Sequence, residues 1–313
     1  MRERLALLER FPYWPHAPRD AARADVARFA HGLVDDAAFE EHRVESGALV
    51  AFAARQHLAW DTEQLGLRAA RVAYVIDDRG DGLHDRVVDA SIAKAQADGY
   101  GYVFTRIDAG DLRTVQACER AGFVTVDAIL SQYIEVARAP RIELPGDVAI
   151  VEATHDDADR MSALVDATLA RSRFHDDPCF GPERGRALYR TWAANCVRGL
   201  NELTLIARIE GRDVGYLTVK DNKAARAGFG WGYGRIELVG VLDGFRGRGV
   251  VGALTAALVA RCERFGWARL GVGTQTWNVA AIRAYQKAGF VPGDSIFSMR
   301  WRIDDLGDGA PHG

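Results

Sequence analysis

The chain has little net charge, no long apolar run and few cysteines. Its formal net charge is −3 over 313 residues and its pI is about 6.3, so no overall basic field would attract nucleic acid or anionic lipid. The longest apolar runs, such as residues 48–54, are far too short to span a bilayer. The amino terminus lacks the apolar core of a signal peptide. We therefore expect no nucleic-acid partner and no membrane association.

The cysteines and the bulk composition indicate an ordinary cytoplasmic protein. Four cysteines are scattered without C-x-x-C spacing, which favours a reducing cytoplasm over a disulfide framework. A content of 48% hydrophobic and 27% charged residues is sufficient for one large or two moderate globular domains. Neither a Ser-His-Asp set nor a Cys-His pair with supporting context indicates a covalent acyl-enzyme.

A glycine-rich, basic turn is the most informative motif that is present. It follows an apolar strand and precedes an apolar helix, within residues 239–254. Glycines allow the backbone to approach a ligand closely, and the first amides of a helix attract an anion. The turn therefore predicts a pyrophosphate site, although a basic surface turn would share part of the pattern. Its glycines and arginines are Arg246, Gly247, Arg248, Gly249 and Gly252.

The residues after the turn predict helix, strand and helix. Apolar residues recur at helical spacing from Val251 to Phe265, and Gly266 ends that helix. A strand is expected at 270–274, followed by a helix with Asn278 as N-cap and Gly289 just past its end.

The turn resembles the Q/R-x-x-G-x-G/A signature of the GNAT acyl-CoA N-acyltransferase superfamily. Arg246 to Val251 fit it except at the sixth position, where Val251 replaces Gly or Ala and Gly252 follows. Walker and Rossmann fingerprints are not matched, which argues against an NTPase or a dehydrogenase. The resemblance implies an α/β fold with a mixed sheet, acetyl-CoA as acyl donor, no metal, and direct transfer to an amine.

The resemblance also implies which residues bind the coenzyme. The strand 235–241 is expected to separate from its neighbour, to offer backbone groups to the pantetheine arm and to supply an N–H to the thioester oxyanion. Asn278 would bind the coenzyme in addition to capping its helix, although capping alone would explain it. The predicted coenzyme-binding residues are Val239, Gly240, Val241, Arg246, Gly247, Arg248, Gly249, Val250, Val251, Gly252, Asn278 and Ala281.

Two residues are candidates for catalysis. Tyr285 matches the superfamily tyrosine that protonates the departing thiolate, and a core tyrosine is the alternative. Glu237 is nominated as general base acting through water, because the amine must lose a proton. Strand alternation would place Glu237 on one face with Val239 and Val241. A charged edge residue paired with a neighbour explains Glu237 equally well.

An internal repeat relates the two halves of the chain. Residues 79–82 match 246–249, and the same offset of 167 residues pairs 121–124 with 288–291. The first copy differs where the second has its candidate site. There, Asp81, Asp85, Asp111 and Cys118 replace Arg248, Gly252, Asn278 and Tyr285. Acidic side chains would repel a diphosphate, so we expect two tandem GNAT-like units of which the first is degenerate.

The repeat suggests three segments. We expect a mostly helical N-terminal segment at 1–45, the degenerate unit at 46–140 and the catalytic unit at 147–313. The boundary lies in a segment that two prolines interrupt.

A narrower resemblance concerns the acceptor. Segments 60–66, 170–178 and 274–281 are similar to the dTDP-fucosamine and related nucleotide-sugar N-acetyltransferases. The implied acceptor is the amine of a nucleotide-linked 4-amino-4,6-dideoxy sugar. Arg171, Arg173 and His175 would meet its pyrophosphate, a choice made from charge type, although a lone loop histidine is more often solvated.

The aromatic residues at 229–233 are a further acceptor candidate. Phe229, Trp231 and Tyr233 share a face if extended, and Trp231 could stack on a base or sugar ring; a packed hairpin is an equal alternative.

Other functions remain open from the sequence. The same chemistry on an aminoglycoside-like product or other small amine is one alternative, and a non-catalytic acyl-CoA-binding regulator is another. Protein or tRNA acetylation is disfavoured by the fused units and the mildly acidic charge. A homodimer is possible.

Overall fold

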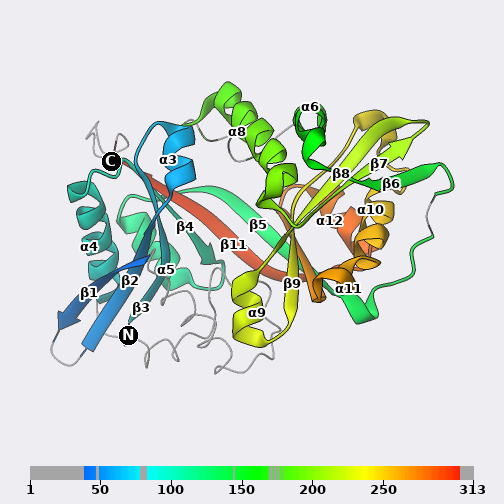
Figure 1. Ribbon diagram of the computed structural model, residues 1–313. Coiled ribbons are helices and arrows are strands. Elements are labelled where there is room, and N and C mark those ends of the chain that lie inside the picture. The colour runs from blue at the N-terminus through cyan, green and yellow to red at the C-terminus, as the bar shows by residue number, and fades with distance from the viewer. Residues whose placement is uncertain are drawn as a thin grey trace. The chain divides into compact units, whose positions relative to one another are not determined.

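A computed structural model describes residues 39–46, 49–77, 83–143, 145–168, 172, 174, 177 and 179–303. It confirms the expected α/β class with a mixed sheet (Figure 1). The chain divides into two compact units, residues 1–129 with 294–313, and residues 130–293. No helix in the described part of the chain is both long and apolar enough to cross a bilayer.

The first unit is a mixed sheet with two main helices. Strands β2 and β3 pair antiparallel, β3 and β4 pair parallel, and β11 pairs antiparallel with β4 in the order β1-β2-β3-β4-β11. Helix α4 packs on the first three strands and on α5 (Figure 1). The elements are β1 (Phe39–Ser46), β2 (Leu49–His57), α3 (Ala59–Leu65), β3 (Ala69–Asp77), α4 (Leu83–Ala97), β4 (Tyr102–Asp108), α5 (Leu112–Arg120), β5 (Val124–Glu135) and β11 (Val291–Arg302).

The second unit is a sheet in the order β5-β10-β9-β8-β7-β6. Its apolar core lies between the sheet and α10, where Leu205, Leu217 and Leu254 are fully buried. Its elements are η1 (Val136–Arg138), β6 (Val148–Glu152), η2 (His155–Asp157), α6 (Ala158–Thr168), α8 (Gly181–Asn195), η3 (Cys196–Leu200), β7 (Leu203–Ile209), β8 (Arg212–Asp221), α9 (Lys223–Phe229), β9 (Gly232–Val241), η4 (Asp243–Phe245), α10 (Val250–Val259), α11 (Cys262–Phe265), β10 (Trp267–Gln275) and α12 (Val279–Lys287).

The two units exchange their last strands. The end of β5 follows the helices of the first unit but neighbours β10 in the second, whereas residues 296–302 of β11 pair with β4 in the first. The compact units therefore begin and end at 129/130 and 293/294, whereas the sequence pattern places the repeat boundary at 140–147. A linear repeat pattern cannot reveal which sheet a strand joins.

Secondary structure repeats at the offset seen in the sequence. Helices α4 and α10 begin at Leu83 and Val250, and α5 and α12 begin at Leu112 and Val279, which are both 167 residues apart. The two α-helical pairs therefore occupy equivalent positions in their units.

Two local predictions differ from the structure. The N-terminal segment at 1–45 was expected to be mostly helical; residues 1–38 lie outside the described residues, and residues 39–45 form part of β1, paired with β2, because their alternating charged pattern suits an edge strand as well as a helix. The helix expected from 251 to 265 is broken into α10 and α11 by a turn at Ala260 and Arg261. Gly266 ends α11 in the left-handed region, as predicted.

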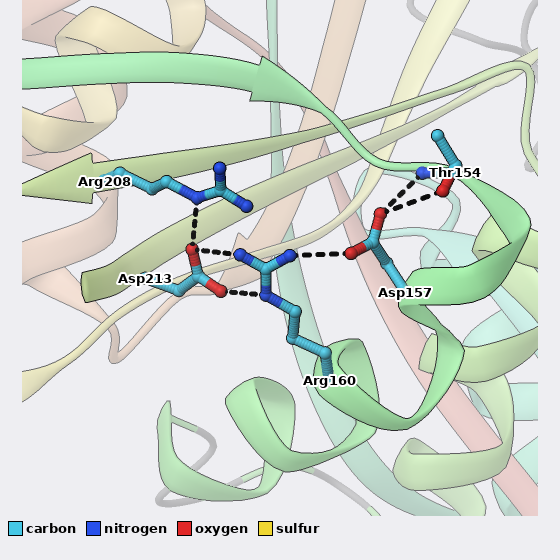
Figure 2. Close-up of polar contacts among 5 residues, drawn as sticks. All are labelled: Thr154, Asp157, Arg160, Arg208 and Asp213. Carbon is cyan, nitrogen blue, oxygen red and sulfur yellow. Dashed lines mark hydrogen bonds and ion pairs between the residues drawn. The ribbon is translucent and has the colours of Figure 1, made fainter. Parts of the chain in front are cut away.

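A charged network fixes the start of α6 (Figure 2). Thr154 and Asp157 form a capping box, in which the Thr154 amide donates to Asp157 over 2.8 Å. Arg160 donates to Asp157 over 2.7 Å and makes a bidentate pair with Asp213 at the start of β8. Arg208 on β7 donates to the same carboxylate over 2.8 Å. The network ties α6 to the β7–β8 hairpin.

The network makes unit stability depend on pH. Burial opposes ionisation of Asp213, but hydrogen bonds from Arg160 and Arg208 outweigh it and lower its pKa. A lowered folded-state pKa contributes stability above the unfolded value of about 4, which is lost as the pH falls through the folded value. We expect Asp213→Asn to cost about 1 kcal/mol at pH 7 and to lose less on going to about pH 3.5 than the wild type.

Urea unfolding followed by tryptophan fluorescence at both pH values measures this difference. Asp156→Asn is the matched control, since Asp156 is exposed beside the network. Equal pH dependence of the wild type and Asp213→Asn would contradict the expected role.

Candidate functional site

The parallel strands β9 and β10 separate halfway along their length. Their pairing runs from Gly232 and Trp267 to Ile236 and Val272 and ends there, although β9 continues to Val241. The separation predicted for this strand is therefore present.

A β-bulge lies at the point of separation. Val219 of β8 pairs with Ile236, and Thr218 pairs with Leu238, so that Glu237 is the extra residue. Strand alternation predicted that Glu237 shares a face with Val239 and Val241. This prediction is wrong, because the bulge shifts the alternation. Those two valines pack against the core under α10. Glu237 instead acts on Cys196 at the end of α8, where burial and, to a lesser degree, the charge of Glu237 raise the pKa of the thiol.

Backbone groups beyond the bulge alternate between β8 and the gap. The amide of Leu238 donates to Thr218 Oγ1 over 3.0 Å, and that of Leu242 donates to the carbonyl of Val214 over 2.9 Å. Both therefore face β8. By the two-residue alternation of a strand, Val239 and Val241 direct their N–H and C=O groups toward the β10 side.

The glycine-rich turn lies at the end of the same strand. Gly247 and Gly249 have φ values of 78° and 79°, which side chains disfavour, and Gly249 is the N-cap of α10. Among the described residues, none accepts a hydrogen bond from the amides of 247–252. This run of free donors at a helix start is suited to an anion.

The two arginines of the turn are already paired. Arg246 lies 2.8 Å from Asp243, and its Nε donates to the carbonyl of Val241 over 3.3 Å. Arg248 forms an ion pair with Asp147. Both arginines are about half exposed, so a bound anion would compete with weak, solvated pairs.

Helix α12 carries Asn278 and Tyr285. Asn278 Oδ1 accepts from the amide of Ala281 over 3.2 Å, which confirms the predicted N-cap and leaves the side-chain NH2 for other partners. Tyr285 is 4% exposed and belongs to the core of the unit. Burial, and to a lesser degree Tyr216, raises the pKa of Tyr285, so the phenol stays protonated at neutral pH.

In the first unit, the equivalent helix ends are bridged by side chains. His84 Nε2 lies 2.8 Å from Thr114 Oγ1, which donates to Asp111 over 2.6 Å. Asp85 and Arg120 add an ion pair at 2.6 Å. The equivalent residues of the second unit, Val251, Ala281, Asn278, Gly252 and Lys287, form no such bridge among the described residues.

Cys118, at the position of Tyr285, is buried, and burial raises the pKa of its thiol to about 12. The thiol is therefore neutral at physiological pH. The first-unit turn itself, residues 79–82 with Asp81, lies outside the described residues.

The predicted acceptor residues are only partly placed. Arg171, Arg173 and His175 lie outside the described residues. Residues 229–233 are not extended throughout, so the condition for a shared face is not met: Phe229 ends α9, and Gly230, at φ 76°, turns the chain into β9. Trp231 lies six residues before Glu237, against Tyr233 and the buried Arg269.

Three buried hydroxyl residues at the site were not predicted. Tyr216 and Thr168 form a hydrogen bond of 3.1 Å next to Gly240, and Thr218 holds the bulge. Within the apolar strand 214–219 no spacing distinguishes Tyr216 from an ordinary core residue. Among the described residues, no group of three or more His, Cys, Asp and Glu is placed to hold a metal.

Comparison with known proteins shows what this part of the chain is similar to. Residues 170–290 match the model of the acetyltransferase (GNAT) family. The spore coat polysaccharide biosynthesis protein SpsD of Bacillus subtilis (strain 168) is 21% identical over 242 residues, which are 76% of this chain and 79% of that protein.

Solved structures share the fold over most of the chain. A GCN5-related N-acetyltransferase from Sphaerobacter thermophilus has a TM-score of 0.56 and 18% identity, covering 92% of this chain and 87% of its own. A tandem GNAT protein from the clavulanic acid biosynthesis pathway has a TM-score of 0.54 and 15% identity, covering 96% and 92%.

Proposed function

We propose that the GNAT acetyltransferase domain at residues 170–290 transfers the acetyl group of acetyl-CoA to the amine of a nucleotide-linked amino-deoxy sugar, of the dTDP-4-amino-4,6-dideoxyhexose type. GNAT enzymes use acetyl-CoA as their acetyl donor. The observation that carries the proposal is the run of amides at 247–252 that have no acceptor among the described residues, directly beyond the point where β9 separates from β10.

The residues of the second unit fit acetyl-CoA as a substrate. The amides of Gly247 to Gly252 would hold its diphosphate, with Arg246 and Arg248 adding charge. Val239 and Val241 would pair with the pantetheine amides as a short added strand. Asn278 and Ala281 would line the same arm from the start of α12.

For acetyl transfer, residues of this chain would have to stabilise the oxyanion, remove a proton from the amine and protonate the thiolate. The N–H of Val239, which faces the gap, would stabilise the thioester oxyanion as the amine nitrogen bonds to the carbonyl carbon. Glu237 would take the amine proton through water, and its bulge turns it toward the α8 side. Tyr285 would give its proton to the thiolate as the carbon–sulfur bond breaks. The products are the amide and free coenzyme A.

The sugar acceptor rests on similarity and charge. SpsD, by its name, works in polysaccharide biosynthesis. The nucleotide-sugar resemblance of segments 60–66, 170–178 and 274–281 favours the same acceptor class. Arg173 and His175 are candidates for binding its diphosphate, and Trp231 for stacking on its base or sugar ring. Trp231 precedes Glu237 by six residues, which is about 20 Å at the rise of a β-strand.

A thiol-release assay with acetyl-CoA tests the proposal. We expect the highest kcat/KM for a nucleotide-linked 4-amino-4,6-dideoxyhexose and a much lower value for the same sugar without its nucleotide. Faster turnover of an aminoglycoside would assign the same chemistry to another amine. Coenzyme binding without turnover of any amine would indicate a regulator and overturn the proposal.

A further inference from the structure

The last residue of α6 is hydrogen-bonded to the strand beside the candidate site. Thr168 Oγ1 lies 2.9 Å from the carbonyl of Leu164 and 3.1 Å from Tyr216 Oη. Thr168 Oγ1 also lies 3.1 Å from the carbonyl of Val165, so its hydroxyl is shared between the helix backbone and Tyr216 Oη. Both side chains are at least nine-tenths buried.

This Thr168–Tyr216 pair rests directly on β9. A Cβ built on Gly240 would lie 2.6 Å from Thr168 Oγ1 and 2.7 Å from Tyr216 Oη. Gly240 therefore has to lack a side chain for the two hydroxyls to reach the strand. It lies between Val239 and Val241, whose backbone groups face the gap.

Helix α6 is thus attached to β8 at both ends. Arg160 near its start binds Asp213 of β8 (Figure 2), and Thr168 at its end binds Tyr216 of the same strand. From Arg160 to Thr168 the helix rises about 12 Å, and from Asp213 to Tyr216 the strand rises about 10 Å. The spacing of the two attachment points on α6 therefore matches their spacing on β8. The helix cannot slide along β8 without breaking one of them.

We propose that Thr168 and Tyr216 are a positioning pair, which fixes the end of α6 against β9 and thereby sets where the acceptor amine meets the thioester. The inference rests on the proposed function. The pair touches β9 on the side of α6, opposite to the core under α10. Its loss should therefore weaken acceptor binding and leave coenzyme binding intact.

Kinetics of four variants test the positioning pair. Tyr216→Phe and Thr168→Val each remove one hydroxyl, and each should raise KM for the acceptor by roughly 5-fold, the size of one buried hydrogen bond, with KM for acetyl-CoA unchanged. The double variant should be no worse than either single one, because both remove the same bond. Thr168→Ser keeps the hydroxyl and should restore the wild-type value.

Two results would overturn the proposal. One is equal change in both KM values, which marks general loss of structure. The other is Thr168→Ser behaving like Thr168→Val, which assigns the effect to the methyl group.

Hydrogen exchange separates this inference from the proposed function. If the wild type acetylates no amine, the proposed function fails, but the pair is still tested by exchange at Val165 to Thr168. Tyr216→Phe should speed exchange there and Thr168→Ser should not. Unchanged exchange in Tyr216→Phe would show that the bond does not hold the helix end.

Discussion

Replacing Tyr285 by phenylalanine is expected to lower kcat by about 100-fold or more, with little change in KM for acetyl-CoA. The ring fills the same space in the core of the second unit, so packing is retained. Only the hydroxyl that would protonate the thiolate is lost. A stopped assay of thiol release at saturating acetyl-CoA and acceptor measures the change.

The raised pKa of Tyr285 gives this prediction a second readout. Because burial holds its pKa above the ordinary value of about 10, the acid form persists through neutral and mildly alkaline pH. The wild-type kcat should therefore show no falling limb from this residue below about pH 10.

A matched control is available in the other unit. Tyr100 is equally buried in the first unit, and Tyr100→Phe should leave kcat unchanged. A full-rate Tyr285→Phe enzyme would remove this tyrosine from the mechanism.

Replacing Gly252 by aspartate should raise KM for acetyl-CoA by roughly 10- to 100-fold. The change installs in the second unit the residue that the first unit has at the same position, Asp85. A carboxylate on the first turn of α10 faces the diphosphate that the free amides would bind, and like charges a few ångströms apart repel. Steady-state kinetics and calorimetric titration with coenzyme A both measure the loss.

Gly252→Asn is the control for size. Among the described residues, a Cβ built at Gly252 comes within 4 Å only of Ile142, at 3.4 Å, so there is room for a side chain. The asparagine variant has the same shape without the charge and should lose much less affinity. About 1 M salt should narrow the gap between the two variants. If the two variants lose affinity equally at low salt, repulsion is not the cause.

Local signals in the sequence predicted the helix ends around the site. Asn278, Gly266 and Gly289 act as predicted, because capping depends on residues a few positions apart. The glycine-rich turn was found from the same kind of short-range pattern, and the fold class followed from the family resemblance that this turn carries.

Features that depend on distant residues were not predictable. The bulge at Glu237 is defined by pairing with Thr218 and Val219, and it reverses the face that simple alternation assigned to the glutamate. The Thr168–Tyr216 pair joins residues 48 positions apart. The sequence contains both partners but not their proximity.

The degeneracy proposed for the first unit would have two physical parts, of which the sequence predicted one. Acidic replacements were visible as charges at Asp85 and Asp111. The bridge from His84 through Thr114 to Asp111 was not, because it needs the start of α4 next to that of α5. Asp111, expected to repel a ligand, thus also accepts a hydrogen bond from Thr114, the residue that contacts His84 of α4.

The placement of β11 has a consequence for how the protein is made. Val103 pairs with Trp301, so the sheet of the first unit is incomplete until a segment roughly 200 residues further along the chain has been translated. Pairing of strands so far apart in the sequence is slow. The half that leaves the ribosome first is therefore the half completed last. Until synthesis ends, β4 has an open edge that invites association with other nascent chains.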